Sequence, residues 1–167
     1  MKENLFHISE IFTSIQGEGD CAGINSLFVR FQYCNLNCIW CDSKFTWSNK
    51  EKIVSKTANE LKKLILQFPA PHVIFTGGEP LLYPLEKLIV EEKKLHVETN
   101  GTIIPTEDLH IKLANGINFE KKAMSEDELK KFHWVVSPKL SNAKQKINET
   151  AIDFWNQKTD CIFKLII

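Results

Sequence analysis

One short stretch of the sequence reads Cys34-Asn35-Leu36-Asn37-Cys38-Ile39-Trp40-Cys41 and places three thiols on a single loop. The apolar residues 26–31 just before it have the composition of a β-strand that runs into this loop. Iron–sulfur clusters are held by cysteine thiolates, usually four for each cluster. With three thiolates on the loop, one iron would stay open to a substrate or cofactor. The stretch therefore predicts a cluster with an open coordination position.

A zinc site is the competing interpretation of the same cysteines. Closed structural zinc sites take four ligands, usually as paired Cys-x-x-Cys knuckles, and the sequence contains no second knuckle. An odd number of cysteines, three of them clustered, argues against a disulfide framework. We expect Cys21 and Cys161 to be small buried residues and not a fourth cluster ligand. We expect the scattered histidines to be structural or solvent-facing: His7, His72, His96, His110 and His133.

Length and composition indicate an ordinary globular chain. It has 167 residues, enough for one domain with a sizeable core, and 43% of them are hydrophobic and 25% charged. Because the net charge is zero, the overall charge favours neither nucleic acid nor an anionic membrane as partner. No apolar run approaches the roughly 18 residues of a membrane span, and the first residues lack a signal-peptide core. We expect a cytoplasmic protein that binds neither nucleic acid nor membrane.

Strand-like and helix-like segments alternate along most of the chain. Strands are predicted at residues 26–31, 73–75, 95–98, 134–136 and 161–167. Helices are predicted at residues 57–67, after Pro84, after Ser125 and at 148–156, whereas residues 102–124 read as irregular with a turn at Asn115-Gly116. Thr57 with Glu60, and Ser125 with Glu128, have the spacing of capping boxes. The alternation predicts parallel β/α units joined by right-handed crossovers.

Residues with functional potential follow the ends of four predicted strands: Cys34, Thr76, Asn100 and Ser137. Parallel β/α folds carry their sites at these C-terminal strand ends. The apolar residues 161–167 have no helix after them, so a strand there would leave a sheet edge uncovered. We therefore expect that a later β/α segment is missing or that a partner subunit covers this edge.

A second motif, Gly77-Gly78-Glu79-Pro80, stands at the end of the next predicted strand. A Gly-Gly pair after a strand lets bare backbone approach a ligand closely, although such turns are common in any protein. Together with the cysteine loop, the motif resembles the radical S-adenosylmethionine superfamily. The resemblance implies a [4Fe-4S] cluster on Cys34, Cys38 and Cys41, with S-adenosyl-L-methionine on the open iron. The cluster would cleave that cofactor reductively to a 5′-deoxyadenosyl radical, so no side chain has a catalytic role.

A narrower resemblance covers nearly the whole chain. The matching segments are residues 10–19, Phe28-Val29-Arg30, Cys34-Asn35-Leu36, Trp40-Cys41-Asp42-Ser43, residues 76–82, Glu98-Thr99-Asn100-Gly101 and Ser137-Pro138-Lys139. In this order they are similar to the 7-carboxy-7-deazaguanine synthases. The resemblance implies an α/β fold, an incomplete parallel (β/α) barrel of the radical S-adenosylmethionine type. Residues 1–167 would form a single core domain that lacks the family's last β/α segment.

The resemblance also implies an activity. Members of that family are carbon–nitrogen lyases that convert 6-carboxy-5,6,7,8-tetrahydropterin into 7-carboxy-7-deazaguanine and ammonia. The reaction is a radical ring contraction, supported by magnesium, that leads to queuosine, a modified base of tRNA. A homodimer and an electron donor such as flavodoxin or ferredoxin are implied as partners.

Binding residues are carried over from the same resemblance. Substrate contacts would come from Ile15, Gln16, Gly17, Arg30 and Thr76, with Arg30 forking onto the substrate carboxylate. Cofactor contacts would come from Trp40, Cys41, Asp42, Gly78, Ser137, Pro138 and Lys139, with Glu98 as a further contact. Ser43 stands where the family usually has a threonine whose hydroxyl binds magnesium, and serine keeps that oxygen.

Two other functions fit part of the sequence. A glycyl-radical activating enzyme would share the cysteine spacing and the glycine motif but act on a protein. Residues 16–19, Arg30 and Ser43 favour the synthase instead. A cluster-binding form with weak or no activity would fit the chain's ending, because relatives usually continue into a segment that adds cofactor contacts and a terminal substrate contact.

Overall fold

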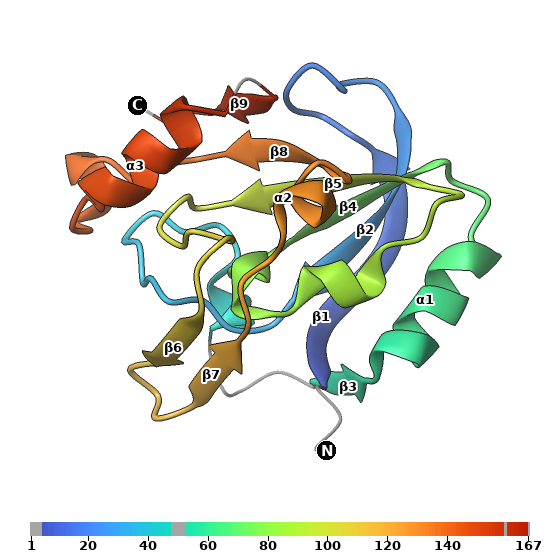
Figure 1. Cartoon of the computed structure of the whole chain (residues 1–167), viewed down its shortest axis with the longest axis horizontal. Helices are drawn as coiled ribbons and strands as arrows, with labels where there is room; N and C mark the ends of the chain where they lie inside the picture. Colours follow the sequence, from blue (N-terminus) through green and yellow to red (C-terminus); the bar gives the residue numbers. More distant parts are fainter. Residues whose placement is uncertain (1–4, 48–52, 159, 167) are drawn as a thin grey trace.

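The computed structural model describes residues 5–47, 53–158 and 160–166. Its central feature is a seven-stranded sheet with the order β3-β1-β2-β4-β5-β8-β9 (Figure 1). The strands are β1 (Phe6–Ile15), β2 (Asn25–Phe31), β3 (Val54–Lys56), β4 (His72–Gly77), β5 (Lys94–Thr99), β8 (Phe132–Val136) and β9 (Cys161–Phe163). From β2 to β9 the neighbours are parallel, whereas β1 pairs antiparallel with β2 and with β3. The predicted mostly parallel α/β sheet is confirmed.

The helices begin where the sequence places their caps. Thr57 and Glu60 form the predicted capping box at the start of α1 (Ala58–Gln67). Ser125 and Glu128 form another before the short α2 (Glu126–Leu129), and the side chain of Asn148 caps α3 (Glu149–Asn156). Single 3-10 turns occupy several connections: η1 (Lys44–Thr46), η2 (Pro80–Leu82), η3 (Leu85–Leu88) and η4 (Ser141–Ala143). None of the helices in the described part of the chain is long and apolar enough to cross a membrane.

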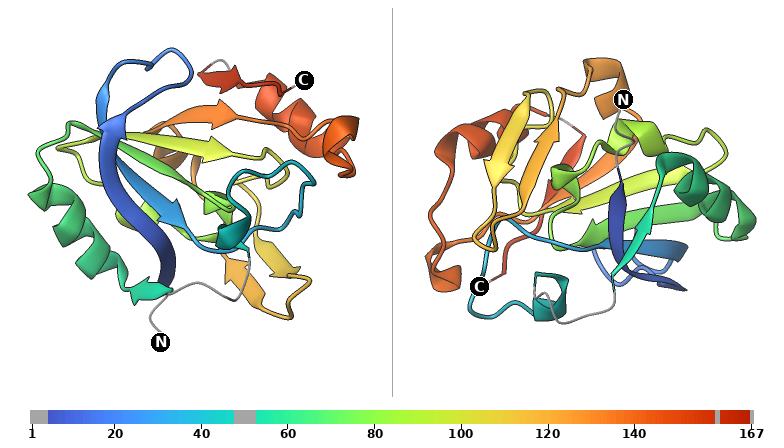
Figure 2. Two further views of the ribbon diagram at one scale, coloured as in Figure 1. Left: turned by 180° about the vertical axis from the view of Figure 1, so that it is seen from behind. Right: turned by 90° about the horizontal axis from the view of Figure 1, so that it is seen from below.

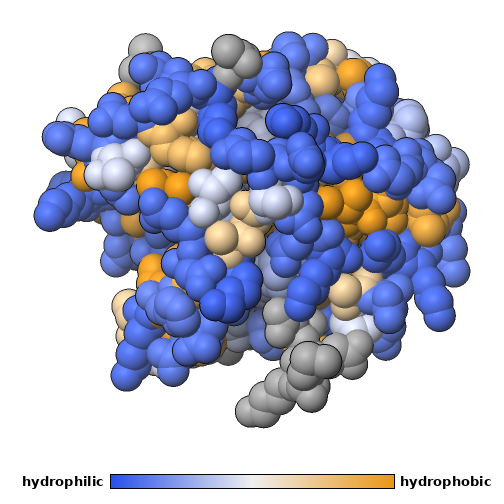
Figure 3. Space-filling model, viewed as in Figure 1, coloured by the Kyte–Doolittle hydropathy of each residue, from blue (hydrophilic) through white to orange (hydrophobic). Residues whose placement is uncertain are grey.

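The hydrophobic core lies on one face of the sheet. Alternate residues of a strand point to opposite faces, so Val73 and Phe75 of β4 enter the core while Thr76 faces the other way. Leu61 and Ile65 of α1 are fully buried against this face. Figure 2 (right) separates the two sides: α2 and a β-hairpin lie on one side, and the loop after β2 lies on the other. The surface over the helical side is mostly hydrophilic, with apolar groups scattered through it (Figure 3).

The prediction that residues 102–124 are irregular is wrong. They contain an antiparallel hairpin of β6 (Leu109–Lys112) and β7 (Asn118–Lys121), and only the turn at Asn115-Gly116 was foreseen. Phe119 and Lys121 are its buried residues, while most of their neighbours are exposed. The hairpin escaped prediction because its exposed side is charged and polar, which leaves too few apolar residues for a strand pattern. Lys121 is only 6% exposed, although it is a lysine.

Other elements also differ from the sequence prediction, and the short strand β3 is one that was not predicted. The strand β1 was not predicted, because residues 10–19 were interpreted as a binding motif. The helix expected after Pro84 is a single 3-10 turn that buries Leu85 and Leu88. The last strand ends at Phe163, and Leu165 is 58% exposed, so the residues after β9 are not packed on both faces. Ile167 lies outside the described residues.

The Gly77-Gly78 turn passes directly against the chain that enters the cysteine loop. A Cβ atom on Gly78 would lie 1.9 Å from the carbonyl oxygen of Tyr33, and one on Gly77 would lie 2.4 Å from that of Phe31. Gly77 also has a φ of +126°, which side chains disfavour. The N–H of Gly78 donates to the Phe31 carbonyl at 3.1 Å, and that of Glu79 to the Tyr33 carbonyl at 2.8 Å. The fold itself therefore requires both glycines, whatever ligand they meet.

Replacing Gly78 with alanine should destabilise the protein, because the new methyl group meets backbone that has no room to move. Overpacking of this kind costs about 1–3 kcal/mol or more, and for a chain of this size each kcal/mol lowers Tm by roughly 2–4 °C. Thermal unfolding of the cluster-free protein would measure the loss. Gly17→Ala is the control, since a Cβ there has no neighbour within 4 Å. Equal Tm values for the two variants would contradict the steric argument.

Candidate active site

A cavity of about 540 Å³ opens at the C-terminal ends of the parallel strands, on the face opposite the core. The ends of β2, β4, β5 and β8 contribute Arg30, Thr76, Glu98 and Ser137 to its wall. The loop after β2 crosses these strand ends (Figure 2, left) and adds the three clustered cysteines. A cavity of this volume falls within the range of small-molecule sites, about 300–1,000 Å³.

The cysteine loop begins with a sharp, well-anchored bend at Tyr33. This residue has a φ of +73°, in the left-handed region that residues other than glycine rarely enter. The bend persists because the Tyr33 N–H donates to the Thr46 carbonyl at 2.5 Å and its own carbonyl accepts from Glu79. Farther along, the Cys41 N–H donates to the Cys38 carbonyl at 3.2 Å. These bonds hold the loop in the conformation that directs its thiols into the cavity.

A buried carboxylate joins the glycine turn to the end of β5. Glu79 is fully buried and accepts hydrogen bonds from the Leu81 N–H at 2.9 Å, the Thr99 hydroxyl at 2.8 Å and the Asn100 N–H at 2.8 Å. Burial raises the pKa of Glu79, and the hydrogen-bond donors oppose that shift. These three hydrogen bonds satisfy the buried carboxyl group of Glu79, so it can remain away from water at this position.

Asn100 extends the same connection to the cysteine loop. Its side-chain amide donates to Asn35 Oδ1 at 2.9 Å and lies 3.8 Å from Cys34 Sγ. Its carbonyl oxygen accepts from the N–H and the hydroxyl of Thr102. The ends of β4 and β5 and the start of the loop therefore form one hydrogen-bonded unit, which the sequence analysis did not foresee.

The cysteine loop offers the donor set that an iron–sulfur cluster needs. Cys34, Cys38 and Cys41 line one cavity, and the Leu36 N–H lies 3.4 Å from Cys34 Sγ. The ammonium charge of Lys139 acts on Cys34 and Cys38. Burial, assisted by the charge of Glu79, raises the pKa of Cys34 to about 12, so ligation has to displace the proton. Three thiols that line one cavity, with N–H donors and a cation nearby, fit a cluster.

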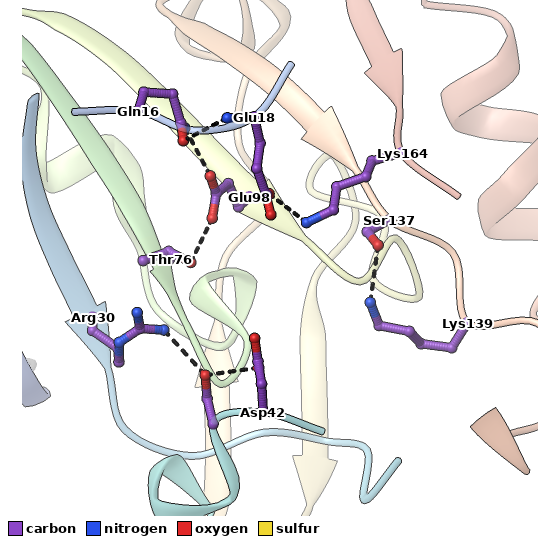
Figure 4. Close-up of polar contacts among 10 residues, drawn as sticks. Gln16, Glu18, Arg30, Asp42, Thr76, Glu98, Ser137, Lys139 and Lys164 are labelled. Atoms are coloured by element: carbon purple, nitrogen blue, oxygen red, sulfur yellow. Dashed lines mark hydrogen bonds and ion pairs between the residues drawn. The ribbon is translucent and has the colours of Figure 1, made fainter. Parts of the chain in front are cut away.

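A polar wall faces the cysteines across the cavity. Glu98 accepts from the Gln16 side-chain amide at 2.9 Å and from the Thr76 hydroxyl at 2.7 Å (Figure 4). The Glu18 N–H donates to Gln16 Oε1 at 3.2 Å, which fixes the orientation of that amide. Gln16 is 5% exposed although it lies in a connection between strands. The wall thus offers a carboxylate, an amide and a hydroxyl in one fixed arrangement.

Arg30 and Ser43 lie together beside this wall. The guanidinium donates to Glu10 at 3.0 Å and to Ser43 Oγ at 3.3 Å, and Ser43 in turn donates to Asp42 at 3.0 Å. The rings of Phe12 and Phe45 lie 5.9 Å from the guanidinium carbon. A guanidinium has five N–H donors, so Arg30 retains donors beyond these two bonds.

Lys139 forms the opposite end of the cavity. Its ammonium donates to Ser137 Oγ at 3.0 Å (Figure 4). It also lies 5.3 Å from the centre of the Trp40 ring. Burial lowers the pKa of Lys139. The indole N–H groups of Trp40 and Trp47 are buried without a hydrogen-bond partner, and both residues line the cavity.

An ion pair spans the cavity between two segments far apart in sequence. Lys164, just after β9, pairs with Glu18 in the connection between β1 and β2 (Figure 4). Lys164 and Ile166 line the cavity, and the Ile166 carbonyl accepts from the Asn142 amide at 3.0 Å. The residues after β9, which were predicted to continue the strand, therefore turn toward the cavity instead of extending the sheet.

The structure brings most of the predicted site residues to the cavity. Those that line it are Gln16, Gly17, Arg30, Cys34, Cys38, Trp40, Cys41, Asp42, Ser43, Thr76, Gly78, Glu98, Ser137 and Lys139. The Ile15 side chain is 66% exposed, and Pro138 lines a separate small cavity. Sequence reasoning missed Thr46, Trp47, Lys164 and Ile166. The aromatic Trp47, close behind the cysteines, was a usable signal, whereas nothing in the pattern marks the other three.

Comparison with known families explains why a loop of three thiols lies against a glycine turn at these strand ends. The model of the radical SAM superfamily matches residues 28–138, and the chain belongs to that superfamily. Its members hold a [4Fe-4S] cluster and use S-adenosylmethionine.

The relatives in sequence are more specific. Over 108 residues the chain is 41% identical to the 7-carboxy-7-deazaguanine synthase of Aquifex aeolicus. This alignment covers 60% of the present chain and 48% of the Aquifex protein. Over 142 residues it is 34% identical to the synthase of Pyrobaculum aerophilum, covering 81% of this chain and 56% of that one. The chain spans about half the length of the curated relatives it matches.

One solved structure confirms the predicted fold. The crystal structure of QueE from Escherichia coli matches 97% of this chain and 84% of its own, with a TM-score of 0.62 and 24% identity. The predicted α/β fold, a partial barrel of the radical S-adenosylmethionine type, is therefore confirmed.

Replacing any one of Cys34, Cys38 and Cys41 with alanine should prevent cluster assembly. The three thiolates already leave one of the four irons without a protein ligand. Losing one more cysteine would leave only two protein ligands for the whole cluster. Iron and sulfide analysis after anaerobic reconstitution would show close to four of each in the parent protein and almost none in the variants. Cys161→Ala is the matched control, because this thiol donates to the carbonyls of Trp155 and Lys158 and does not line the cavity. Undiminished iron in the loop variants would contradict the assignment.

Proposed function

We propose that this chain is a 7-carboxy-7-deazaguanine synthase, which converts 6-carboxy-5,6,7,8-tetrahydropterin into 7-carboxy-7-deazaguanine and releases ammonia. The observation that carries the proposal is the division of one cavity into two chemically distinct ends. Cysteines, glycine turn and Lys139 form one end, and the Gln16–Glu98–Thr76 wall with Arg30 forms the other. The identity to curated synthases supports it further.

At the first end, the chain's residues would hold the cluster and the cofactor. When bound, the two together supply a carbon-centred radical from reductive cleavage of S-adenosylmethionine. Cys34, Cys38 and Cys41 are the ligands we assign to the cluster. Asp42, Gly78 and the segment Ser137-Pro138-Lys139 are the contacts we assign to the cofactor, together with Trp40, which lines the cavity. Lys139, partly withdrawn from water, is a suitable donor to a carboxylate.

At the second end, the chain's residues would recognise the pterin. Its ring edge carries several N–H donors and a carbonyl, each of which needs a partner once the ring is buried. The amide of Gln16 and the hydroxyl of Thr76 provide such partners, and Ile15 and Gly17 flank them in the backbone. The resemblance implied a cofactor contact for Glu98, but its bonds to Gln16 and Thr76 lead us to assign its carboxylate to the pterin end. Arg30 would fork onto the substrate carboxylate with the donors it does not use toward Glu10 and Ser43.

Magnesium belongs to the same proposal. We assign it to Ser43, whose hydroxyl and the neighbouring Asp42 carboxylate are hard oxygen donors 3.0 Å apart. The guanidinium of Arg30 lies 3.3 Å from that hydroxyl, so an ion there needs additional negative charge. The substrate carboxylate would supply this negative charge, and it could bind the magnesium ion and the Arg30 guanidinium at the same time. Metal and substrate would therefore bind together.

The competing function is activation of a glycyl-radical protein. Such an enzyme must admit a protein loop, whereas here the Glu18–Lys164 ion pair joins two segments that line the cavity. This contact favours a small substrate. A homodimer, an electron donor such as flavodoxin or ferredoxin, and a role in queuosine biosynthesis rest on the resemblance alone.

A direct assay tests the proposed function. Anaerobically reconstituted protein, given S-adenosylmethionine, 6-carboxy-5,6,7,8-tetrahydropterin, magnesium and a chemical reductant, should form 7-carboxy-7-deazaguanine and ammonia. Mass spectrometry of the product decides the question. Magnesium should raise the rate in the parent protein and in Ser43→Thr but not in Ser43→Ala. Cofactor cleavage without any deazaguanine, in a protein with a full cluster, would refute the proposal.

Arg30→Ala should weaken binding of the pterin and leave binding of S-adenosylmethionine nearly intact. Losing a partly buried charged contact costs about 2–5 kcal/mol, which is at least roughly thirtyfold in Kd. Titration calorimetry with each ligand separately would give both constants. Glu10→Gln is the control, because it removes the ion-pair partner of Arg30 and keeps the guanidinium. A parallel loss of affinity for both ligands would mean that Arg30 shapes the cavity and does not recognise the substrate carboxylate.

A further inference from the structure

A second group of metal-binding side chains lies on the cavity face of the sheet, near the other ends of the same strands. His72 begins β4, and His96 of β5 pairs in register with His133 of β8. By strand alternation His72 shares a face with Thr76, and His96 shares a face with Glu98. The connection between β1 and β2 brings Cys21 to the same place. Histidines that are scattered along the sequence are therefore brought together in space.

The side chains of this group lie close enough together to hold a metal ion. One ligand atom from each of Cys21, His96 and His133 lies within 4.8 Å of the other two. His96 is buried, and the other two residues are half-buried. One thiol and two imidazoles are typical ligands for zinc and related ions, whereas magnesium and calcium take oxygen.

Neighbouring groups hold these ligands in place from outside. Asp20 Oδ1 lies 3.0 Å from His133 Nε2, and His72 Nδ1 lies 2.7 Å from His96 Nε2. The rings of His72 and His96 also stack with centroids 4.9 Å apart. A carboxylate or second imidazole behind a ligating histidine is the usual outer layer of a metal site, because it orients the ring.

We propose that Cys21, His96 and His133 bind one divalent transition metal of the zinc class, in a site separate from the cysteine loop. Its fourth position is open to water or to Asp20. The ion would tie the connection between β1 and β2 to the strands beneath it. That connection carries Gln16 and Glu18, and it is already closed by backbone bonds between Gln16 and both Gly23 and Ile24. The metal therefore has a structural role, fixing the loop that forms one wall of the active cavity.

Zinc binding can be measured without relying on activity. The protein, reconstituted with its iron–sulfur cluster, would be incubated with a small excess of zinc, desalted and analysed for both metals. We expect about one zinc per chain in addition to the full iron content. Zinc-edge X-ray absorption should then give one sulfur and two imidazole nitrogens as protein ligands.

Variants identify the residues. Cys21→Ser and His133→Asn should each lose most of the zinc and keep the iron. Cys161→Ser and His110→Asn are the matched controls, one a second isolated cysteine and the other an exposed histidine, and both should keep zinc and iron.

Two results would overturn the proposal. One is a desalted parent protein that retains no zinc above the level of Cys21→Ser. The other is an absorption spectrum with several sulfur ligands, which would place the zinc on the cysteine loop. Because the spectrum is recorded on the parent protein, the test holds even if a variant fails to fold. It is also independent of the pterin reaction, since neither measurement involves turnover.

Discussion

The site depends on a buried carboxylate. Glu79 lies at the end of the glycine turn, fully buried, and its two oxygens accept from Leu81, Thr99 and Asn100. Removing a buried acceptor with three donors would leave those donors without partners, which costs about 1–3 kcal/mol for each. Through Asn100 the same bonds reach Cys34 and Asn35, so the cysteine loop, the glycine turn and the end of β5 keep their relative positions. The polar wall and Lys139 are therefore arranged around a cysteine loop and a glycine turn whose positions are fixed.

The central strands of the parallel sheet were predictable from the sequence, because both of their faces are buried and their residues are mainly apolar. β4 therefore contains the continuous apolar run of residues 73–75, β5 keeps the apolar Leu95 and Val97, and capping residues marked α1 and α2. Elements with one exposed side were not predictable to the same degree. β1 is half-exposed, and the β6–β7 hairpin keeps charged residues on its outer side. Their apolar signal is weak, and tertiary pairing decides their conformation.

Much of the candidate site could be assigned from the sequence, because its cysteines, glycines and strand-end polar residues occur in motifs that act locally. Contacts between distant segments could not be assigned in this way. Nothing near Glu98 predicts that it bridges Gln16 and Thr76, and nothing near Lys164 predicts its pairing with Glu18. The histidines are the clearest case. Their separation along the chain hides the fact that parallel strands place His96 beside His133.

Gly77 and Gly78 cross closely over the backbone of Phe31 and Tyr33. This contact limits which substitutions the glycine turn can accept as the sequence diverges. The clash that a side chain would cause there is with backbone, so no compensating substitution in a neighbour can relieve it. A descendant that abandoned iron and lost its three cysteines would still need both glycines, as long as β2 and β4 remain adjacent. Selection therefore acts on the two motifs separately: the cysteines are retained for chemistry and the glycines for architecture. In a distant homologue, a glycine pair at this crossing would therefore reflect the packing of the two strand ends and would not by itself indicate retained enzymatic activity.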